Sequence, residues 1–247
     1  MINLDNVTVV SLAGFNYDSA VRAIEYSQHG INFADSKILS PEKPGYLPAT
    51  VKWEETPILR RRAPGVDDYS HYFLYDIWRH IETEFALVVQ GDGYVINPRA
   101  WTDEFLQFDY IGSPWPLSRK SYIDPFGNHR QVGNGGFSLR SRRLLSLPLE
   151  VSIPWDVNAN SFYKQFEEVG LAEDGNIAVH NRHLFEAGGC RFADVDLAVR
   201  FAKEMPIPEG RGIKPFGFHK YYPGRSKRKL LRHAGAWLPG YLGFYKN

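Results

Sequence analysis

The segment Gln90-Gly91-Asp92-Gly93 ends the apolar run FALVVQ of residues 85–90, which has the composition of a buried strand. In α/β proteins, ligands bind at the carboxyl ends of such strands. Side chains two residues apart in extended backbone point the same way, so Gln90 and Asp92 would face one ligand. A carboxylate in that place could hold a divalent cation that bridges a diphosphate. The same residues also fit an ordinary Asp-Gly turn, and the pattern leaves both interpretations open.

A second candidate is the glycine-rich stretch VGNGGFSLRS at residues 132–141. Three glycines lie within four positions around Asn134, although each glycine costs backbone entropy on folding. Gly135 and Gly136 therefore indicate a tight turn that closely approaches a ligand. The spacing differs from the GxGxxG fingerprint of dinucleotide-binding folds, and a structural β-turn is the alternative.

Two adjacent acids, Glu173 and Asp174, precede a stretch at residues 176–187 that predicts a helix. Carboxylates at a helix start are stabilised by the helix dipole, typically by about 0.3–1 kcal/mol, which is one sufficient reason for their presence. The same dipole would keep a carboxylate ionised and able to remove a proton from an attacking hydroxyl. Far along the chain, His219 in the sequence FGFH is either a packed histidine or a second ligand to a cation held by Asp92.

Other polar clusters carry weaker signals. His180 and His183 lie three residues apart on the predicted helix, but no third ligand accompanies them, so they are interpreted as surface residues. The basic stretch RSKRKLLRH at residues 225–233 is typical of a solvated tail helix. Contact with an anionic membrane or a lipid-linked acceptor is its functional alternative.

The elements that must position these residues alternate between strands and helices. A β-branched run at residues 7–12 predicts a strand and residues 18–29 a helix, which is the start of a βαβ unit and indicates a parallel sheet. The sequence further predicts strands at 85–90, 109–112 and 136–139, and helices at 69–84, 140–147, 162–169 and 176–187. A polar stretch at residues 118–132 predicts a long loop, with the role of a lid over a bound donor. This order predicts an α/β protein.

The composition is that of a globular protein. Of 247 residues, 43% are hydrophobic and 23% charged, which suffices for one large domain or two small ones. The net charge of +1 gives no general attraction to nucleic acid or to an anionic membrane. A single cysteine, Cys190, excludes a disulfide within the chain and fits a reducing compartment. No apolar run reaches the ~18 residues of a membrane span, and the N-terminus lacks the basic region of a signal peptide, so we expect a cytoplasmic protein.

The order of the motifs is more specific than any one of them. The chain contains, in sequence, VVQGDGYVINPRAW, FDYIGSPWP, VGNGGFSLRS, AEDGNIAVHNRHLFEAGGC and KPFGFHKY. From about residue 5 to residue 220 this string resembles the bacterial glycosyltransferase-like family DUF5672 and, more distantly, the GT-A fold galactosyltransferases. The resemblance implies a GT-A-like single domain at residues 1–222, with a central, mostly parallel sheet flanked by helices. A basic and aromatic tail would follow at residues 223–247.

The resemblance also implies a donor site. Asp92 and His219 would bind Mn²⁺ or Mg²⁺. Gln90 stands where the family pattern Asp-x-Asp has its first acid, and with Gly91 it would lie against the nucleotide. Three residues at the end of the first predicted strand would contact the nucleotide as well: Ser11, Leu12 and Ala13.

Acceptor and catalytic roles follow from the same resemblance. Asp174 would be the base of an inverting reaction, and Glu173 would contact the substrate sugar. Trp115 would stack on the acceptor. The glycine-rich segment would line the donor sugar and the acceptor through Asn134, Gly135 and Gly136.

The resulting expectation is a metal-dependent glycosyltransferase of the hexosyltransferase type, acting in surface polysaccharide or lipopolysaccharide synthesis. Its partners would be a nucleotide-sugar donor and a glycan or lipid-linked acceptor, without nucleic acid, and the tail would reach the inner face of the membrane. Two other classes stay open. A non-catalytic carbohydrate-binding module would bind sugar without nucleotide or metal, and a metal-dependent hydrolase or nucleotidyltransferase would need no acceptor hydroxyl.

Overall fold

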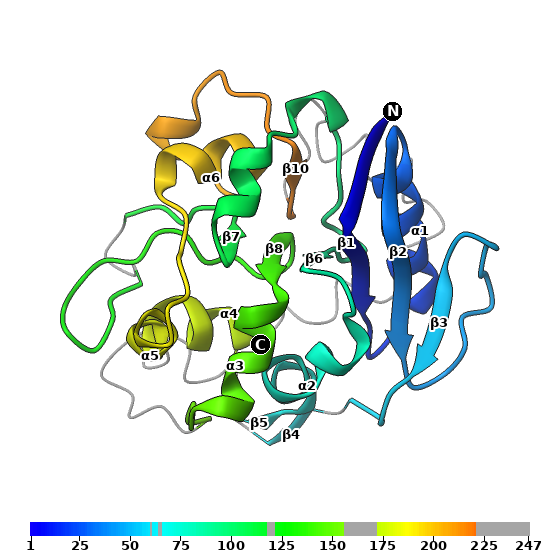
Figure 1. Cartoon of the computed structure of the whole chain (residues 1–247), viewed down its shortest axis with the longest axis horizontal. Helices are drawn as coiled ribbons and strands as arrows, with labels where there is room; N and C mark the ends of the chain where they lie inside the picture. The colour runs from blue at the N-terminus through cyan, green and yellow to red at the C-terminus, as the bar shows by residue number, and fades with distance from the viewer. Residues whose placement is uncertain (60, 64–65, 118–121, 156–171, 221–247) are drawn as a thin grey trace, which may run out of the picture.

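A six-stranded sheet forms the centre of the computed structural model, which describes residues 1–59, 61–63, 66–117, 122–155 and 172–220 (Figure 1). The strand order is β3-β2-β1-β6-β8-β7. These strands are β1 (Ile2–Leu12), β2 (Ile31–Ser40), β3 (Lys52–Glu55), β6 (Phe85–Val88), β7 (Tyr110–Gly112) and β8 (Ser138–Ser141). Two small sheets pair β4 (Arg61–Ala63) with β5 (Val66–Asp67) and β9 (Ala202–Lys203) with β10 (Gly217–Phe218).

The sheet is mixed, because β8 runs against both of its neighbours. The pairs β1–β2, β1–β6 and β2–β3 are parallel, as the βαβ start predicts. Val88 at the end of β6 pairs with Ser138 at the start of β8, and Ser138 also pairs with Gly112 at the end of β7. The glycine-rich segment before β8 therefore reaches the edge of the sheet at which β1, β2 and β6 end. The reversal of one strand thus brings a second loop to the ligand-binding edge.

Helices cover both faces of the sheet (Figure 1). The helices are α1 (Tyr17–Gln28), α2 (Asp68–Tyr75), α3 (Arg142–Glu150), α4 (Glu173–Gly175), α5 (Arg182–Ala187) and α6 (Val195–Phe201). Alternation along β1 places Val7 and Val9 in one apolar core, with α1 and α6. Val10 and Leu12 lie in the other core, with α2, α3 and α5. The sheet is thus buried on both sides, so ligands are restricted to its edges.

Short helical turns complete the described chain. The 3-10 helices are Ile77–His80, Pro98–Ala100, Asp103–Gln107 and Pro208–Gly210, and a π-helix covers Asn176–His180. No helix in the described ranges is both long and apolar enough to cross a membrane.

Two predicted helices differ from the structure. The stretch 69–84 is not one helix, because α2 ends at Tyr75 and a 3-10 turn follows Asp76. Ile77 and Ile81 still pack into the same core as α2, so the apolar stripe is kept while the helix is broken. The stretch 176–187 divides into the π-helix and α5. The helix predicted at 162–169 and the basic tail at 225–233 lie outside the described residues.

Cys190 gives a simple test of this core. The side chain is buried, and burial raises the pKa of its thiol to about 12, because the thiolate would lose its hydration. Since the thiolate is the reactive species, we expect Cys190 to resist a thiol reagent such as DTNB near pH 8 in the native protein. One thiol per chain should react after denaturation in guanidinium. Rapid labelling of the folded protein would contradict the packing around α5.

Candidate functional site

Asp92 and His219 meet at the edge of the sheet although they are far apart in the sequence. Asp92 lies in a tight turn after β6, closed by Gln90 N to Gly93 O at 2.9 Å and Gly93 N to Gln90 O at 2.8 Å. His219 follows β10, and the backbone N–H of Lys220 donates to the Asp92 carbonyl at 2.8 Å. The imidazole Nε2 lies 3.6 Å from Asp92 Oδ1. The turn interpretation of this segment therefore holds, and the role of the Asp92 carboxylate as a cation ligand stays a prediction.

The His219 ring is held between two carboxylates. Its Nδ1 lies 3.1 Å from Glu204 Oε1, on the side opposite to Asp92. Burial alone would lower the pKa of His219, but the carboxylates of Asp92 and Glu204 outweigh it and raise the pKa to about 9. Burial likewise works against ionisation of Asp92, yet His219 and Lys220 hold the pKa of this carboxyl below its usual value. A divalent cation would find one carboxylate already ionised here.

Gly136 leaves room for the imidazole. A side chain at this position would collide with the ring, because a Cβ would lie 2.5 Å from both Cδ2 and Cε1 of His219 and closer still to Nε2. The glycine at this position is therefore explained by close approach of the backbone to the ring. The sequence predicts that this segment approaches a bound ligand, and at Gly136 the structure shows the backbone against His219, the candidate metal ligand.

We expect Gly136→Ala to destabilise the protein by about 1–3 kcal/mol and to displace His219, as overpacked sites do. The ring has no room to retreat, because Asp92 and Glu204 hold it on both sides. Urea unfolding measures the change in the free energy of unfolding. Gly45→Ala is the matched control, since the nearest atom to its new Cβ is Asp18 Oδ1 at 4.0 Å. Equal stability of the two variants would contradict the described packing.

Asp174 lies on the other side of the same glycine segment. The backbone N–H of Gly135 donates to Asp174 Oδ2 at 3.0 Å, and that of Gly175 donates to Oδ1 at 2.7 Å. The carboxylate is partly buried at the first turn of α4. Burial is the main cause that raises its pKa to about 7, and the negative charge of Glu173 adds to it. A carboxyl group that titrates near neutrality can both accept and hold a proton, which suits a general base.

Glu173 points into the protein. Its carboxylate is buried and pairs with the Arg140 guanidinium, with Nη2 2.9 Å from Oε1. Arg140 is itself fully buried between the rings of Phe73 and Tyr110, with its Cζ 4.2 Å and 5.1 Å from their centroids. The predicted contact of Glu173 with a substrate sugar does not fit this position, since the carboxylate is used in an internal ion pair. Adjacent residues on a helix point in different directions, which separates Glu173 from Asp174.

The residues around Asp92 fit a divalent cation. His219 Nε2 is buried and has no hydrogen-bond partner, and it faces the Asp92 carboxylate. Its other nitrogen is held by a carboxylate, an arrangement that is usual for histidines that bind metals. Among the described residues no group of three His, Cys, Asp or Glu side chains forms a metal site. The protein would therefore supply two ligands, and oxygens of a diphosphate and water would supply the others.

Of the residues predicted to contact the nucleotide, some lie where the sequence predicts and others do not. Ser11, Leu12 and Ala13 do lie at the carboxyl end of β1, where the Ala13 N–H bonds to the Leu39 carbonyl. All three are buried, and Ser11 Oγ has no hydrogen-bond partner. Gln90 does not point with Asp92, because the backbone turns between them and its amide Nε2 donates to Tyr69 OH at 2.9 Å. A nucleotide role for these residues stays a prediction.

Two predictions differ from the structure: the stacking of Trp115 on an acceptor and the position of His180 at the surface. Trp115 is 3% exposed, its ring lies 3.8 Å from that of Tyr122 between centroids, and it packs on Gly133. Stacking on an acceptor requires a free face, which this packing does not leave. His180 is buried rather than at the surface, and burial lowers its pKa. It lies in the π-helix, which turns the apolar residues around it toward the core.

Sequence reasoning missed two residues of the site, Glu204 and Arg140. Glu204 follows β9 and joins His219 to Asn134, while Arg140 on β8 holds Glu173. Glu204 belongs to none of the motifs, and Arg140 stands in the motif VGNGGFSLRS, where no role is predicted for it. All four residues of the strand SLRS are buried, so the Arg140 cation needs a partner, but this burial cannot be inferred from the largely polar sequence of the strand.

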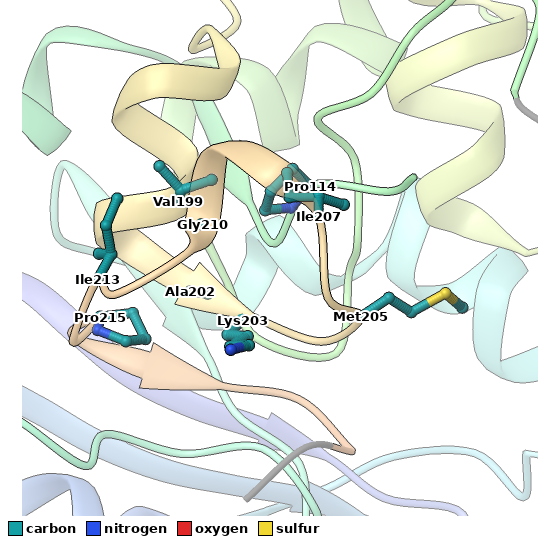
Figure 2. Close-up of a pocket in the computed structure, with 9 residues that line it drawn as sticks. All are labelled: Pro114, Val199, Ala202, Lys203, Met205, Ile207, Gly210, Ile213 and Pro215. Carbon is teal, nitrogen blue, oxygen red and sulfur yellow. The ribbon is translucent and has the colours of Figure 1, made fainter. Parts of the chain in front are cut away.

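A separate apolar hollow lies beside this cluster, between α6, β9 and the 3-10 turn at 208–210 (Figure 2). Its lining includes Val199, Ala202, Ile207 and Pro215, and Lys203 is the one charged residue among the described residues that line it. None of these described lining residues is an acid or a histidine, so they offer no group that would bind a metal or act as a general base. The candidate site is therefore the cluster around the glycine segment.

Comparison with solved structures shows the fold of the chain. Across 93% of this chain and 95% of the other, the structure resembles the crystal structure of galactosyltransferase LgtC in complex with donor and acceptor sugar analogs, with a TM-score of 0.54 at 12% identity. It also resembles an active-site mutant of LgtC over the same shares, with a TM-score of 0.53 at 13% identity. The GT-A-like α/β fold is thereby confirmed. No curated protein matches the sequence. The sequence model of one family matches residues 60–219, well over half of the chain, and the chain belongs to this family, described as protein of unknown function (DUF5672).

Proposed function

We propose that this protein is a metal-dependent glycosyltransferase that moves a sugar from a nucleotide-sugar donor to an acceptor hydroxyl with inversion at the anomeric carbon. One observation carries the proposal. Gly135 and Gly136 are consecutive, and the first bonds to Asp174 while the second lies against His219. The proposed base and the proposed cation ligand thus lie on two sides of one short backbone segment, which supports a displacement at a carbon between them.

In this reaction Asp174 is the general base. Its carboxylate takes the proton of the acceptor hydroxyl as the oxygen attacks the anomeric carbon, and the new bond forms as the bond from that carbon to the diphosphate oxygen breaks. The N–H groups of Gly135 and Gly175 fix the carboxylate and hold both of its oxygens. Arg140 does not contact the substrates in this proposal. Its ion pair with Glu173 anchors the first turn of α4 and thereby holds Asp174 in place.

Asp92 and His219 would hold Mn²⁺ or Mg²⁺, which would neutralise the charge of the departing diphosphate. The donor sugar would lie along the backbone of the glycine segment. The nucleotide would extend toward the ends of β1 and β6. We take the acceptor to be a glycan or lipid-linked sugar of a surface polysaccharide or lipopolysaccharide, as the family resemblance implies.

The test is a thermal-shift screen of nucleoside diphosphates and nucleotide sugars, with and without Mn²⁺. A ligand at a hundredfold excess over its Kd stabilises the folded state by about 2.7 kcal/mol. A shift that requires both nucleotide and Mn²⁺ supports the donor site and identifies the nucleotide. Stabilisation by free sugars alone would support a carbohydrate-binding module instead.

The product then distinguishes the remaining reactions. With the nucleotide identified, NMR of the product formed from the matching donor gives the configuration of the new anomeric centre. Inversion agrees with direct attack assisted by Asp174, and retention would exclude it. Donor cleavage that proceeds at the same rate without any acceptor would indicate a hydrolase.

A further inference from the structure

Glu204 connects the two halves of the candidate site. Its carboxylate is 8% exposed, and each of its oxygens has a different partner. Oε1 lies 3.1 Å from His219 Nδ1, and Oε2 accepts from Asn134 Nδ2 at 2.9 Å. Glu204 follows β9, and His219 follows β10. Because β9 and β10 pair in parallel with Phe218 opposite Lys203, the next residue of each strand lies at the same end of the pair.

The orientation of Asn134 is determined by the backbone. Its Oδ1 accepts from the N–H of Gly136 at 3.1 Å and from that of Phe137 at 3.4 Å. The amide nitrogen must therefore face Glu204, where it can only donate. Rotating the amide by 180° would lose both backbone hydrogen bonds in a buried place, where unpaired polar groups are costly.

The tautomer of His219 follows from the same contact. A carboxylate only accepts, so Nδ1 carries the proton in its bond to Glu204. In the neutral imidazole, the form that can bind a cation, this is the one N–H, so the lone pair lies on Nε2, the nitrogen that faces Asp92. Glu204 thus has two donors directed at it and must offer two acceptors. Glutamine has the same shape but would place an NH₂ group against one of these donors.

We infer that Glu204 is a positioning residue, which directs Nε2 of His219 toward the cation and fixes the Asn134 side chain that shapes the glycine segment. This role rests on the proposed function only in assigning a cation to Asp92 and His219. Its consequence is that the cation ligand His219 and the glycine segment are joined through one side chain.

A reciprocal exchange of amide and carboxylate tests the inference. Glu204→Gln should weaken Mn²⁺ binding by about 10–100-fold, as the loss of a carboxylate behind a metal-binding histidine does. Asn134→Asp should also weaken it, because two carboxylates would then face each other. In the double variant the new carboxylate at position 134 keeps its bonds from Gly136 and Phe137 and accepts from the new amide at 204. That amide's oxygen still accepts from His219, so the double variant should recover most of the wild-type affinity.

The measurement is the dissociation constant of Mn²⁺ alone, obtained by electron paramagnetic resonance of the free ion, with thermal unfolding of every variant in parallel. Glu209→Gln, at an exposed position of the turn 208–210, is the matched control and should bind Mn²⁺ as the wild type does. Recovery in the double variant supports positioning, since a general loss of packing or charge would not be reversed by a second substitution.

The outcomes separate this inference from the proposed function. Unchanged Mn²⁺ affinity of Glu204→Gln, or a double variant no better than the two single variants, would overturn the positioning role even if the protein transfers sugar. A wild-type chain without Mn²⁺ binding would overturn it too. If instead the affinities follow the expected pattern while no nucleotide sugar binds, the positioning role stands and the proposed transferase fails.

Discussion

Asp174→Asn is expected to lower the rate of sugar transfer by about 10²–10⁴-fold, the usual contribution of a general base. The amide cannot accept the acceptor's proton, yet it keeps the size of the side chain and one oxygen, which can accept from one of the two N–H groups of Gly135 and Gly175. Donor binding should change little, because the base acts on the acceptor. The rate is measured at saturating donor, once the nucleotide is known, beside Asp5→Asn, an exposed acid near the start of β1 and thus at the opposite edge of the sheet.

The pH dependence of the transfer rate tests the same role of Asp174. Burial and Glu173 raise the pKa of Asp174 to about 7, and only the ionised form can act as a base. The wild-type rate should therefore fall as the pH is lowered through 7. The residual rate of Asp174→Asn should show no such step. A variant with near wild-type turnover would refute the assignment of Asp174.

The raised pKa of Asp174 also predicts how the stability of the fold depends on pH, and this can be measured without a substrate. The pKa of Asp174 is raised from 3.8 in the unfolded chain to about 7 in the folded one, so the folded state binds its proton more tightly. Ionisation therefore costs stability as the pH rises from about 4 to above 7. Asp174→Asn removes this cost, so its melting temperature relative to that of the wild type should rise as the pH is raised from below 4 to 8. Below pH 4 the Asp174 carboxyl is protonated in both states, and a constant difference across this range would contradict the raised pKa.

Asp92→Ala has the second large expected effect, because it removes the carboxylate that faces His219 Nε2. We expect the loss of the whole Mn²⁺-dependent stabilisation by nucleotide, about 2.7 kcal/mol when the ligand is at a hundredfold excess over its wild-type Kd. The Asp92 side chain is 35% exposed, so the ligand-free variant should remain folded.

Thermal shift with nucleotide and Mn²⁺ measures this loss, and Asp196→Ala, an exposed acid at the start of α6, is the control. If Asp92→Ala still shows the full Mn²⁺-dependent shift, the cation does not bind at Asp92. Loss of the shift in both variants would show that the assay reports surface charge instead of the site.

Local patterns in the chain suffice for much of the fold. The strand at residues 7–12 lies within β1, the helix at 18–29 matches α1 closely, and the strand at 85–90 is β6 in the interior of the sheet. These elements follow from hydrophobic periodicity over neighbouring residues, which is present in any window of the sequence. The same holds for the residues of the site that stand in motifs, such as Asp92, the glycine segment and Asp174.

Contacts between distant segments determine the rest, and periodicity carries no information about them. The direction of β8 depends on how the chain returns across the sheet, and that direction brings Gly136 to the edge where Asp92 lies. His219 reaches Asp92 only because β10 pairs with β9 and bonds to the turn after β6.

The direction of individual side chains is decided in the same way. The sequence alone does not distinguish the roles of the two acids Glu173 and Asp174. In the fold, the buried charge of Arg140 needs a partner and pairs with Glu173, while Asp174 accepts from the backbone N–H of Gly135. Glu204 has no motif at all, and its role exists only because two strand ends place it between His219 and Asn134. The sequence therefore identifies the chemical groups, while packing decides which of them meet, because the energy of a buried charge depends on partners that are far away along the chain.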